Sequence, residues 1–319
     1  MTTARDIVIL AGGISHERDV SLRSGRRVAD ALLEHGHRVT LRDPDAQLLP
    51  WLAETRPDVV WSALLGANGE NGSMSDLLDS LNLPYVGSPA SGMRLAWDKP
   101  TAKSLIGRAG VRTPESITLP KDAFRELGAG NVLDLVIEKL GLPLAVKPAQ
   151  GGSALGITLV DTAEELPRAM VEAYTYHDVV LIEQRIIGTE VTVAVLDSGD
   201  GPVTLPPVEI DSPNRFYNFE TRVNLGETHF YTPARISAEA AARAAEGALI
   251  AHREFGLHQL SRTDFIIDAA GTPWFLESSI NPSLTESAPY PLALEAAGHD
   301  LGWVYTTLVE QSIAAAGTK

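Results

Sequence analysis

The stretch LAVKPAQGGSALGITLV contains a charged side chain and several glycines behind an apolar run, and these residues could do chemistry. The run ends at Lys147, and the turn behind it carries Gly151, Gly152, Ser153 and Gly156. Glycines let backbone amides approach a phosphate group closely, and a lysine adds positive charge. The stretch is not a Walker loop, because GxxxxGK followed by Ser or Thr is absent and no helix begins behind the turn. It predicts a phosphate-binding hairpin, although an ordinary mobile turn has the same composition.

Carboxylates on two later strands suit a divalent cation. Arg262 and Asp264 alternate along RTDFIID, so both side chains point to one face of the strand. Glu277 ends the next apolar run, PWFLE. Two carboxylates from neighbouring strands, facing a lysine and a phosphate loop, predict a Mg²⁺ site that bridges nucleotide phosphates. Each carboxylate alone is more typical of a solvated strand end, and only the combination favours the metal site.

A third group of residues suits the base of a nucleotide. The run VVLIE ends at Glu183 and continues into Gln184, Arg185 and Ile186. Backbone groups exposed just past a strand, beside one acceptor side chain, match the amino edge of an adenine.

Strands and helices in three sections must position these residues. Residues 1–90 alternate strand and helix from DIVILAGG to PYVGS, which is typical of a small doubly wound α/β sheet. Residues 91–186 contain a helix at DKPTAKSLIGRAG and the strands around the glycine-rich turn. Residues 187–319 open on EVTVAVLD and contain an Ala-rich helix before RTDFIID and PWFLE. The predicted fold class is α/β, with an α+β C-terminal part.

Composition excludes several classes of protein. A formal net charge of −15 argues against nucleic acid or an anionic membrane as a partner, since both need a basic face. The chain has no cysteine, so disulfides, thiolate metal sites and a cysteine nucleophile are excluded. The start, MTTARDIVIL, lacks the apolar region of a signal peptide, and no apolar run is long enough to span a membrane. We therefore expect a cytoplasmic protein.

Eight motifs follow one another along the chain: AGGISHERDVSLRSG, GENGSMSDLLDSLNLPYVGS, WDKPTAK, VKPAQGGSALGI, VLIEQRIIGTEVTVAVL, FYNFET, RTDFIID and FLESSINPSLT. With them the chain resembles the D-alanine–D-alanine ligases of the ATP-grasp superfamily, from about residue 7 to residue 310. The resemblance implies an ATP-grasp fold of three subdomains, with the nucleotide between the second and the third. It also implies a two-step reaction. ATP phosphorylates the carboxylate of a first D-amino acid, and an amine then attacks the acyl phosphate to form an amide.

The resemblance also implies roles for residues around MgATP. Lys99 and Lys147 would hold the phosphates, and Gly151, Gly152 and Ser153 would close over them. The adenosine would lie against Glu183, Ile186 and Glu190. One or two magnesium ions would be held by Asp264 and Glu277, with Ser279 as a weak third ligand.

Further implied roles concern the substrates. Arg262 would stabilise the oxyanion of the tetrahedral intermediate, and Glu17 would receive the ammonium group of the first D-amino acid. Arg222 stands where the family has a lysine on a mobile loop. Ser283 and Ala288 would line the site of the second substrate. A homodimer is what the family implies for the assembly.

Departures from the family's pattern gather in the second-substrate site. Ser279 replaces an asparagine, and Ser283 replaces a glycine. The family binds the carboxylate of the second D-alanine with a Ser-Leu pair. Ala288-Pro289 stands at these positions here, which removes a hydroxyl and a backbone N–H. Two further positions also differ: Leu65 replaces a histidine, and Val223 replaces the tyrosine of a Glu–Ser–Tyr lid triad.

Three functions fit these departures. The first is a specialised ligase whose nucleophile is a foreign amine or a nitrogen on the activated substrate itself, as in the cyclo-ligases that form D-cycloserine from O-ureido-D-serine. The second is an intact D-alanine–D-alanine ligase with compensating substitutions. The third is a non-catalytic nucleotide-binding homologue, against which Lys99, Lys147, Arg262, Asp264 and Glu277 argue. We expect the specialised ligase.

Overall fold

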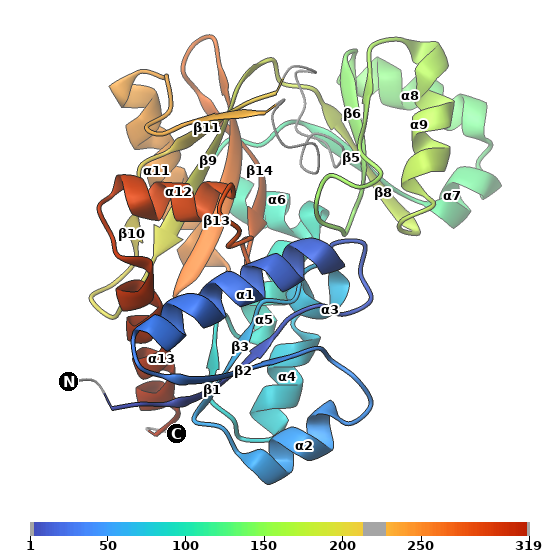
Figure 1. Cartoon of the computed structure of the whole chain (residues 1–319). Coiled ribbons are helices and arrows are strands. Elements are labelled where there is room, and N and C mark those ends of the chain that lie inside the picture. The colour runs from blue at the N-terminus through green and yellow to red at the C-terminus, as the bar shows by residue number, and fades with distance from the viewer. Residues whose placement is uncertain (1–2, 213–227, 318–319) are drawn as a thin grey trace.

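The N-terminal section is a parallel sheet covered by helices. The computed structural model describes residues 3–212 and 228–317 (Figure 1). The sheet has the strand order β2-β1-β3-β4. Its strands are β1 (Asp6–Leu10), β2 (Arg38–Arg42), β3 (Val59–Ser62) and β4 (Tyr85–Val86). Its helices are α1 (Arg18–Glu34), α2 (Leu48–Thr55), α3 (Ala67–Glu70) and α4 (Ser73–Ser80). The predicted βαβαβ pattern is confirmed for this section.

Helix α1 forms because small and apolar side chains recur along one face. Ser21, Ser24, Gly25, Val28 and Leu32 are buried, at the spacing of successive helical turns. Small residues in the first half of α1 let the sheet approach closely. The same half of the helix lies beside the cavity described below.

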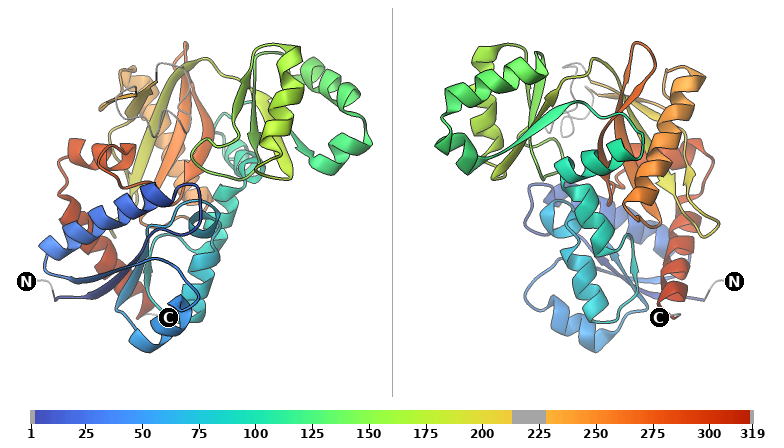
Figure 2. Two further views of the ribbon diagram at one scale, coloured as in Figure 1. Left: turned by 45° about the vertical axis from the view of Figure 1, so that its right-hand side comes forward. Right: turned by 180° about the vertical axis from the view of Figure 1, so that it is seen from behind.

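The central section is an antiparallel sheet that stands apart from the rest (Figure 2). Its strand order is β5-β8-β6-β7. The strands are β5 (Ser116–Pro120), β6 (Leu144–Pro148), β7 (Thr158–Val160) and β8 (Val179–Gln184). The helices are α7 (Lys121–Glu126), α8 (Ala129–Leu140) and α9 (Leu166–Ala173), with a short 3₁₀ turn, η1 (Ala163–Glu165), before α9. The glycine-rich turn joins β6 to β7, as predicted.

The C-terminal section is a larger antiparallel sheet. Its strand order is β12-β11-β9-β13-β14, and β10 pairs with β9. The strands are β9 (Gly188–Leu196), β10 (Val203–Thr204), β11 (Val208–Asp211), β12 (His229–Tyr231), β13 (Leu260–Asp268) and β14 (Pro273–Ser279). The Ala-rich helix α11 (Ala238–Glu254) packs on this sheet. Strand β14 continues two residues beyond Glu277, so the prediction that the strand ends at Glu277 is wrong.

Four more helices join the sections to one another. They are α5 (Ala90–Trp97), α6 (Lys99–Arg108), α12 (Pro289–Ala296) and α13 (Leu301–Ala316). Met93 of α5 and Ile106 of α6 share a buried cluster with the C-terminal sheet. Helix α13 packs against the N-terminal sheet, where Tyr305 meets Trp61 edge to face with 5.1 Å between ring centroids. The boundaries between the three sections, after residue 90 and after residue 186, stay a prediction. These four helices make contacts across both boundaries.

The longest helices of the described chain, α1 and α11, have 17 residues each. An apolar helix needs about 20 residues to cross a bilayer. No helix in residues 3–212 or 228–317 has both the length and the apolar character for this.

Candidate active site

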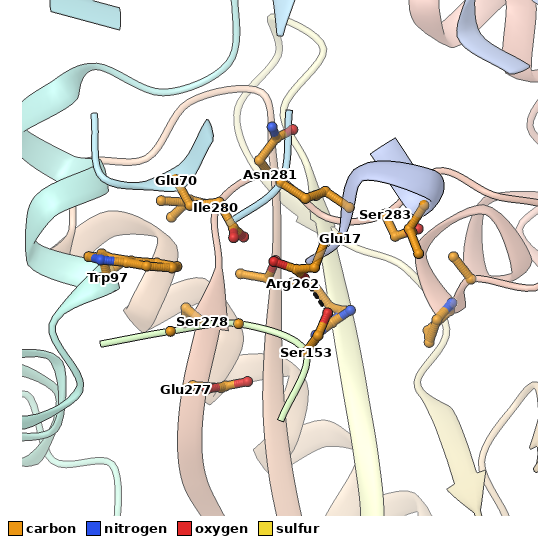
Figure 3. A pocket seen from close by; sticks show the side chains of 18 of the residues that line it. Glu17, Glu70, Trp97, Ser153, Arg262, Glu277, Ser278, Ile280, Asn281 and Ser283 are labelled. Carbon is orange, nitrogen blue, oxygen red and sulfur yellow. Dashed lines mark hydrogen bonds between the residues drawn. The ribbon is translucent and has the colours of Figure 1, made fainter. Parts of the chain in front are cut away.

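Two cavities meet where the three sections come together. We call the first the substrate cavity; it has a volume of about 100 Å³ and lies between the start of α1, the glycine-rich turn, β14 and the 280–289 loop (Figure 3). We call the second the nucleotide cavity; it has a volume of about 110 Å³ and lies between the central and C-terminal sheets. Each is several times larger than the space that one water needs. Glu277 lines both, so the chemistry would take place beside it.

Most residues that were singled out in the sequence line these cavities. The substrate cavity is lined by Glu17, Lys99, Gly151, Gly152, Ser153, Arg262, Glu277, Ser279, Ser283 and Ala288. The nucleotide cavity is lined by Lys147, Glu183, Ile186, Glu190, Asp264 and Glu277. Arg222 and Val223 lie outside the described residues. Leu65, at the position of the family's histidine, lines the substrate cavity.

The nucleotide cavity has apolar walls and a polar edge. Its apolar side chains come from both sheets and from the turn before β7: Ala145, Ile157, Leu159, Ile266 and Leu276. Its polar edge is the end of β8, where Glu183 and Gln184 lead into Ile186. A flat aromatic ring between two apolar surfaces, with hydrogen-bonding groups on one edge, is how a purine is held. The residues present therefore fit an adenine.

Lys147 belongs to a buried group of three charges. Its Nζ lies 2.5 Å from one Glu183 carboxylate oxygen, and Lys103 donates a hydrogen bond to the other. Burial would raise the pKa of Glu183, but the two lysines outweigh burial and hold that pKa below its usual range. The carboxylate of Glu183 is therefore bound by two lysines in this structure. Its contact with adenosine stays a prediction. Lys103 was missed, although it stands one helical turn from Lys99 in WDKPTAK.

Two carboxylates face each other across β13 and β14. Asp264 and Glu277 are directly paired residues of these strands. Glu277 Oε2 lies 3.0 Å from Lys99 Nζ. Among the described residues, no group of three or more His, Asp or Glu side chains is arranged to hold a metal ion without further ligands. Magnesium is commonly held by one or two carboxylates together with water and substrate phosphates, so this pair fits the ion.

Ser279 stands two residues after Glu277 and therefore on the same face of β14. Its partner on β13 is Arg262. The hydroxyl therefore lies on the substrate side of the carboxylate pair, and its predicted role as a weak metal ligand stays a prediction.

Arg262 is the cation between the two cavities. It is buried, and its guanidinium donates two hydrogen bonds to Asp264, from Nε at 2.9 Å and from Nη2 at 2.7 Å. This fork fixes the plane of the guanidinium. Arg262 also lines the substrate cavity. Donors held in this way can stabilise an oxyanion without reorganising.

The glycine-rich turn closes over the substrate cavity. Ser153 has a left-handed backbone (φ 50°), and its hydroxyl donates to the carboxylate of Glu17 (Figure 3). Lys99 Nζ donates to the carbonyl of Gly151 at 2.7 Å. A Cβ atom at Gly152 would lie 3.3 Å from both carboxylate oxygens of Glu17 and from one of Glu70, so a larger residue there would fit tightly. Two members of the predicted lid triad, Glu17 and Ser153, are therefore in contact.

Glu70 is a buried carboxylate that we did not predict. It lines the substrate cavity beside Glu17 and accepts a hydrogen bond from the backbone N–H of Gly66 at 2.9 Å. Burial and the negative charge of Glu17 raise the pKa of Glu70 to about 8. Its side chain is therefore mostly protonated at neutral pH. The motif GENG contains it, but only the fold shows that it is buried.

The stability of the free protein should depend on pH through Glu70. A carboxyl whose pKa is higher in the folded than in the unfolded state favours folding below its unfolded value, about 4.5, and loses this contribution as the pH rises through about 8. Glu277 adds to the shift and Lys99 opposes it. Glu70→Gln keeps an acceptor for Gly66 without the charge. We expect the variant to melt a few degrees above the parent at pH 8.5 and to match it near pH 4.5.

Thermal melts of the two proteins from pH 4.5 to 9 measure this difference. Glu54→Gln, on the exposed surface of α2, serves as the control. A constant offset between Glu70→Gln and the parent across this range would contradict the raised pKa.

Ala288 and Pro289, on the far wall of the substrate cavity, offer no free backbone N–H. The N–H of Ala288 donates to the carbonyl of Thr285 at 3.0 Å. Pro289 and Pro291 occupy two of the first three positions of α12 and have no N–H. Ser283 does not have a left-handed backbone, so the strain that a replaced glycine can cause is absent there. Its hydroxyl lies 3.4 Å from that of Ser24 and 3.3 Å from that of Thr285.

The fold, in which an antiparallel sheet and a glycine-rich hairpin enclose a lysine-lined cavity, is the ATP-grasp fold. The fold matches the VanG D-Ala:D-Ser ligase from Enterococcus faecalis with a TM-score of 0.82, at 26% identity, over 97% of this chain and 100% of that one. It matches a D-alanine--D-alanine ligase from Bacillus anthracis with a TM-score of 0.81, at 25% identity, over 99% of both chains. The predicted ATP-grasp fold is confirmed.

Sequence comparison defines the family more narrowly. Residues 105–314 match the family described as D-ala D-ala ligase C-terminus. A D-alanine--D-alanine ligase of Halalkalibacterium halodurans is 37% identical over 96% of this chain and 99% of its own length. One from Gloeobacter violaceus is 38% identical over 96% and 99%. The chain belongs to the D-alanine–D-alanine ligase family. It is an ATP-grasp ligase that forms a C–N bond, and its cofactors are ATP and Mg²⁺.

Proposed function

We propose that this enzyme joins D-alanine to a second D-amino acid in an ATP-dependent reaction. The observation that carries the proposal is the junction of the two cavities at Glu277, where Lys99, Asp264 and Arg262 converge. Glu17, a buried carboxylate that lines the substrate cavity, suits an ammonium group. An amino acid held by Glu17 at one end and Arg262 at the other would place its carboxylate beside Glu277.

MgATP supplies the phosphoryl group and neutralises charge on it when bound. In the first step a carboxylate oxygen of D-alanine forms a bond to the γ-phosphorus, and ADP leaves. In the second step the amine of the acceptor attacks the carbonyl carbon, loses a proton, and phosphate leaves.

The chain's own groups hold these reactants. Lys99 and Lys147 would bind phosphate oxygens, and Arg262 would donate to the oxyanion. Contact between Ser153 and Glu17 keeps the glycine-rich turn closed, which excludes water from an acyl phosphate that water would hydrolyse.

The prediction of a specialised, ring-closing ligase has no finding in its favour. The relatives that match nearly the whole chain are named D-alanine--D-alanine ligase, which fits the alternative of a dipeptide ligase better. We adopt that alternative. We also propose that the enzyme works in the cytoplasm, where ATP is present. We further propose that it forms a homodimer.

Incubation with D-alanine and MgATP tests the function. We expect phosphate release together with D-alanyl-D-alanine, or with a mixed dipeptide when a second D-amino acid is present, at rates on the order of 1–1,000 per second. Mass spectrometry identifies the product. Hydroxylamine, added in place of the acceptor, traps the acyl phosphate as a hydroxamate and reports the first step alone. Lys147→Ala is the inactive control.

Two results would contradict the proposal. Turnover of O-ureido-D-serine without any dipeptide from D-alanine would restore the ring-closing ligase. A folded protein that forms neither hydroxamate nor dipeptide from any D-amino acid would be a non-catalytic homologue.

A further inference from the structure

The start of α12, on the wall of the substrate cavity, has few free N–H groups for the carboxylate of a second amino acid. Helix N-termini bind anions through free backbone N–H groups. At the start of α12 the N–H of Ala288 is already used, and Pro289 and Pro291 have none. Hydroxyl groups of Ser283, Thr285 and Ser287 line this wall, and neutral hydroxyls do not balance a charge.

The charges around the cavity also disfavour an unassisted carboxylate. The carboxylates of Glu17 and Glu277 line it, together with Glu70, which is mostly protonated at neutral pH, against the cations Lys99 and Arg262. Lys99 is paired with Glu277, and Arg262 with Asp264. A carboxylate that enters this cavity therefore needs a further cation.

Arg23 is placed to supply it. It projects from the second turn of α1 and lines the substrate cavity on the same side as Ser283 and Thr285. It also lines an open groove between α1 and the ends of α12 and α13, so it stands where the cavity meets solvent.

Two other arginines of α1 already have partners. Arg18 pairs with Asp43 at 2.5 Å, and Arg27 pairs with Glu295 at 2.7 Å. Within residues 3–212 and 228–317, no ion pair or hydrogen bond involves the guanidinium of Arg23.

We propose that Arg23 binds the carboxylate of the acceptor amino acid and so replaces the missing N–H donors of α12. This inference rests on the proposed function. A guanidinium can hold a carboxylate with two parallel hydrogen bonds, and the nearby hydroxyls can complete the site. The acceptor is therefore an amino acid with a free carboxylate, and Arg23 sets this specificity from a helix rather than from the 283–289 loop.

Paired acceptors test the role of Arg23. D-alanine serves as the donor, and either D-alanine or D-alaninamide, which lacks the carboxylate, serves as the acceptor. Arg23→Ala should raise the KM for acceptor D-alanine about 10- to 100-fold, the range of one lost charge-assisted contact. The KM for D-alaninamide should stay the same. Arg23→Lys should recover part of the loss, because it keeps the charge without the fork.

The donor site supplies an internal check. Hydroxamate formation from D-alanine and hydroxylamine should be unchanged in Arg23→Ala, since it needs no second carboxylate. Arg26→Ala is the matched control, because Arg26 lines only the groove. An unchanged acceptor KM in Arg23→Ala, in an enzyme that makes dipeptide, would overturn the role of Arg23 and leave the function standing. Equal losses of hydroxamate and dipeptide, in a protein that melts like the parent, would also overturn it. A parent enzyme that makes hydroxamate and no dipeptide would instead overturn the function proposed for the acceptor.

Discussion

Glu277→Gln is expected to lower dipeptide formation by about a thousandfold and to raise the magnesium concentration needed for half-maximal rate. Glu277 lines both cavities, pairs with Lys99 at 3.0 Å and stands opposite Asp264. A neutral amide has nearly the same shape, but it removes one of two charges that a hard cation needs. Initial rates as a function of MgCl₂ at saturating ATP measure both effects.

Two further variants serve as a comparison and a control for Glu277→Gln. Ser279→Ala should change the magnesium requirement only slightly, since a hydroxyl contributes no charge. Glu246→Gln removes an exposed carboxylate of α11 and should have no effect. A larger effect at Ser279 than at Glu277 would show that the metal site was assigned to the wrong side chains.

Arg262→Lys is expected to lower kcat by about 10²- to 10³-fold, with little change in the KM for ATP. Lysine keeps one positive charge, but it cannot make the two parallel hydrogen bonds that hold Arg262 against Asp264. The cation would then lose its fixed direction toward the developing oxyanion. Steady-state kinetics of dipeptide formation separate the two parameters.

A second arginine with the same geometry is the control. Arg235 forms a fork with Glu209, at 3.0 Å from Nε and 2.6 Å from Nη2, but half of its side chain is exposed and it lines neither cavity. Arg235→Lys should leave kcat unchanged. If Arg262→Lys behaved in the same way, Arg262 would be a structural residue rather than a catalytic one.

Local patterns predicted the positions of most site residues. The alternation in RTDFIID placed Arg262 and Asp264 on one face, and β13 confirms this geometry. The apolar run PWFLE predicted β14, but it ended the strand two residues early. Ser278 and Ser279 are small and polar, so they carry no strand signal, whereas pairing with β13 extends the strand through them.

Contacts between distant parts of the chain could not be predicted in this way. Lys103 and Glu183 are 80 residues apart, and neither has a local pattern that reveals the other. Glu70 looks like an exposed glutamate in a polar motif, but in the fold it is buried beside Gly152 and Glu17, which come from distant parts of the chain. The resemblance to a family supplied the order of the site residues, whereas the fold supplied their partners.

Helix α13 has a consequence for how the protein is made. Its residues Tyr305 and Leu308 complete the core around Ile7 and Trp61, so the first strands of the chain are covered by its last helix. Domains usually fold one after another as they emerge from the ribosome. Here part of the apolar face of the N-terminal sheet stays uncovered until residues 301–316 have been made. We therefore expect chaperones to bind this apolar face during synthesis. We also expect a chain that stops before residue 301 to aggregate rather than to fold as a smaller enzyme.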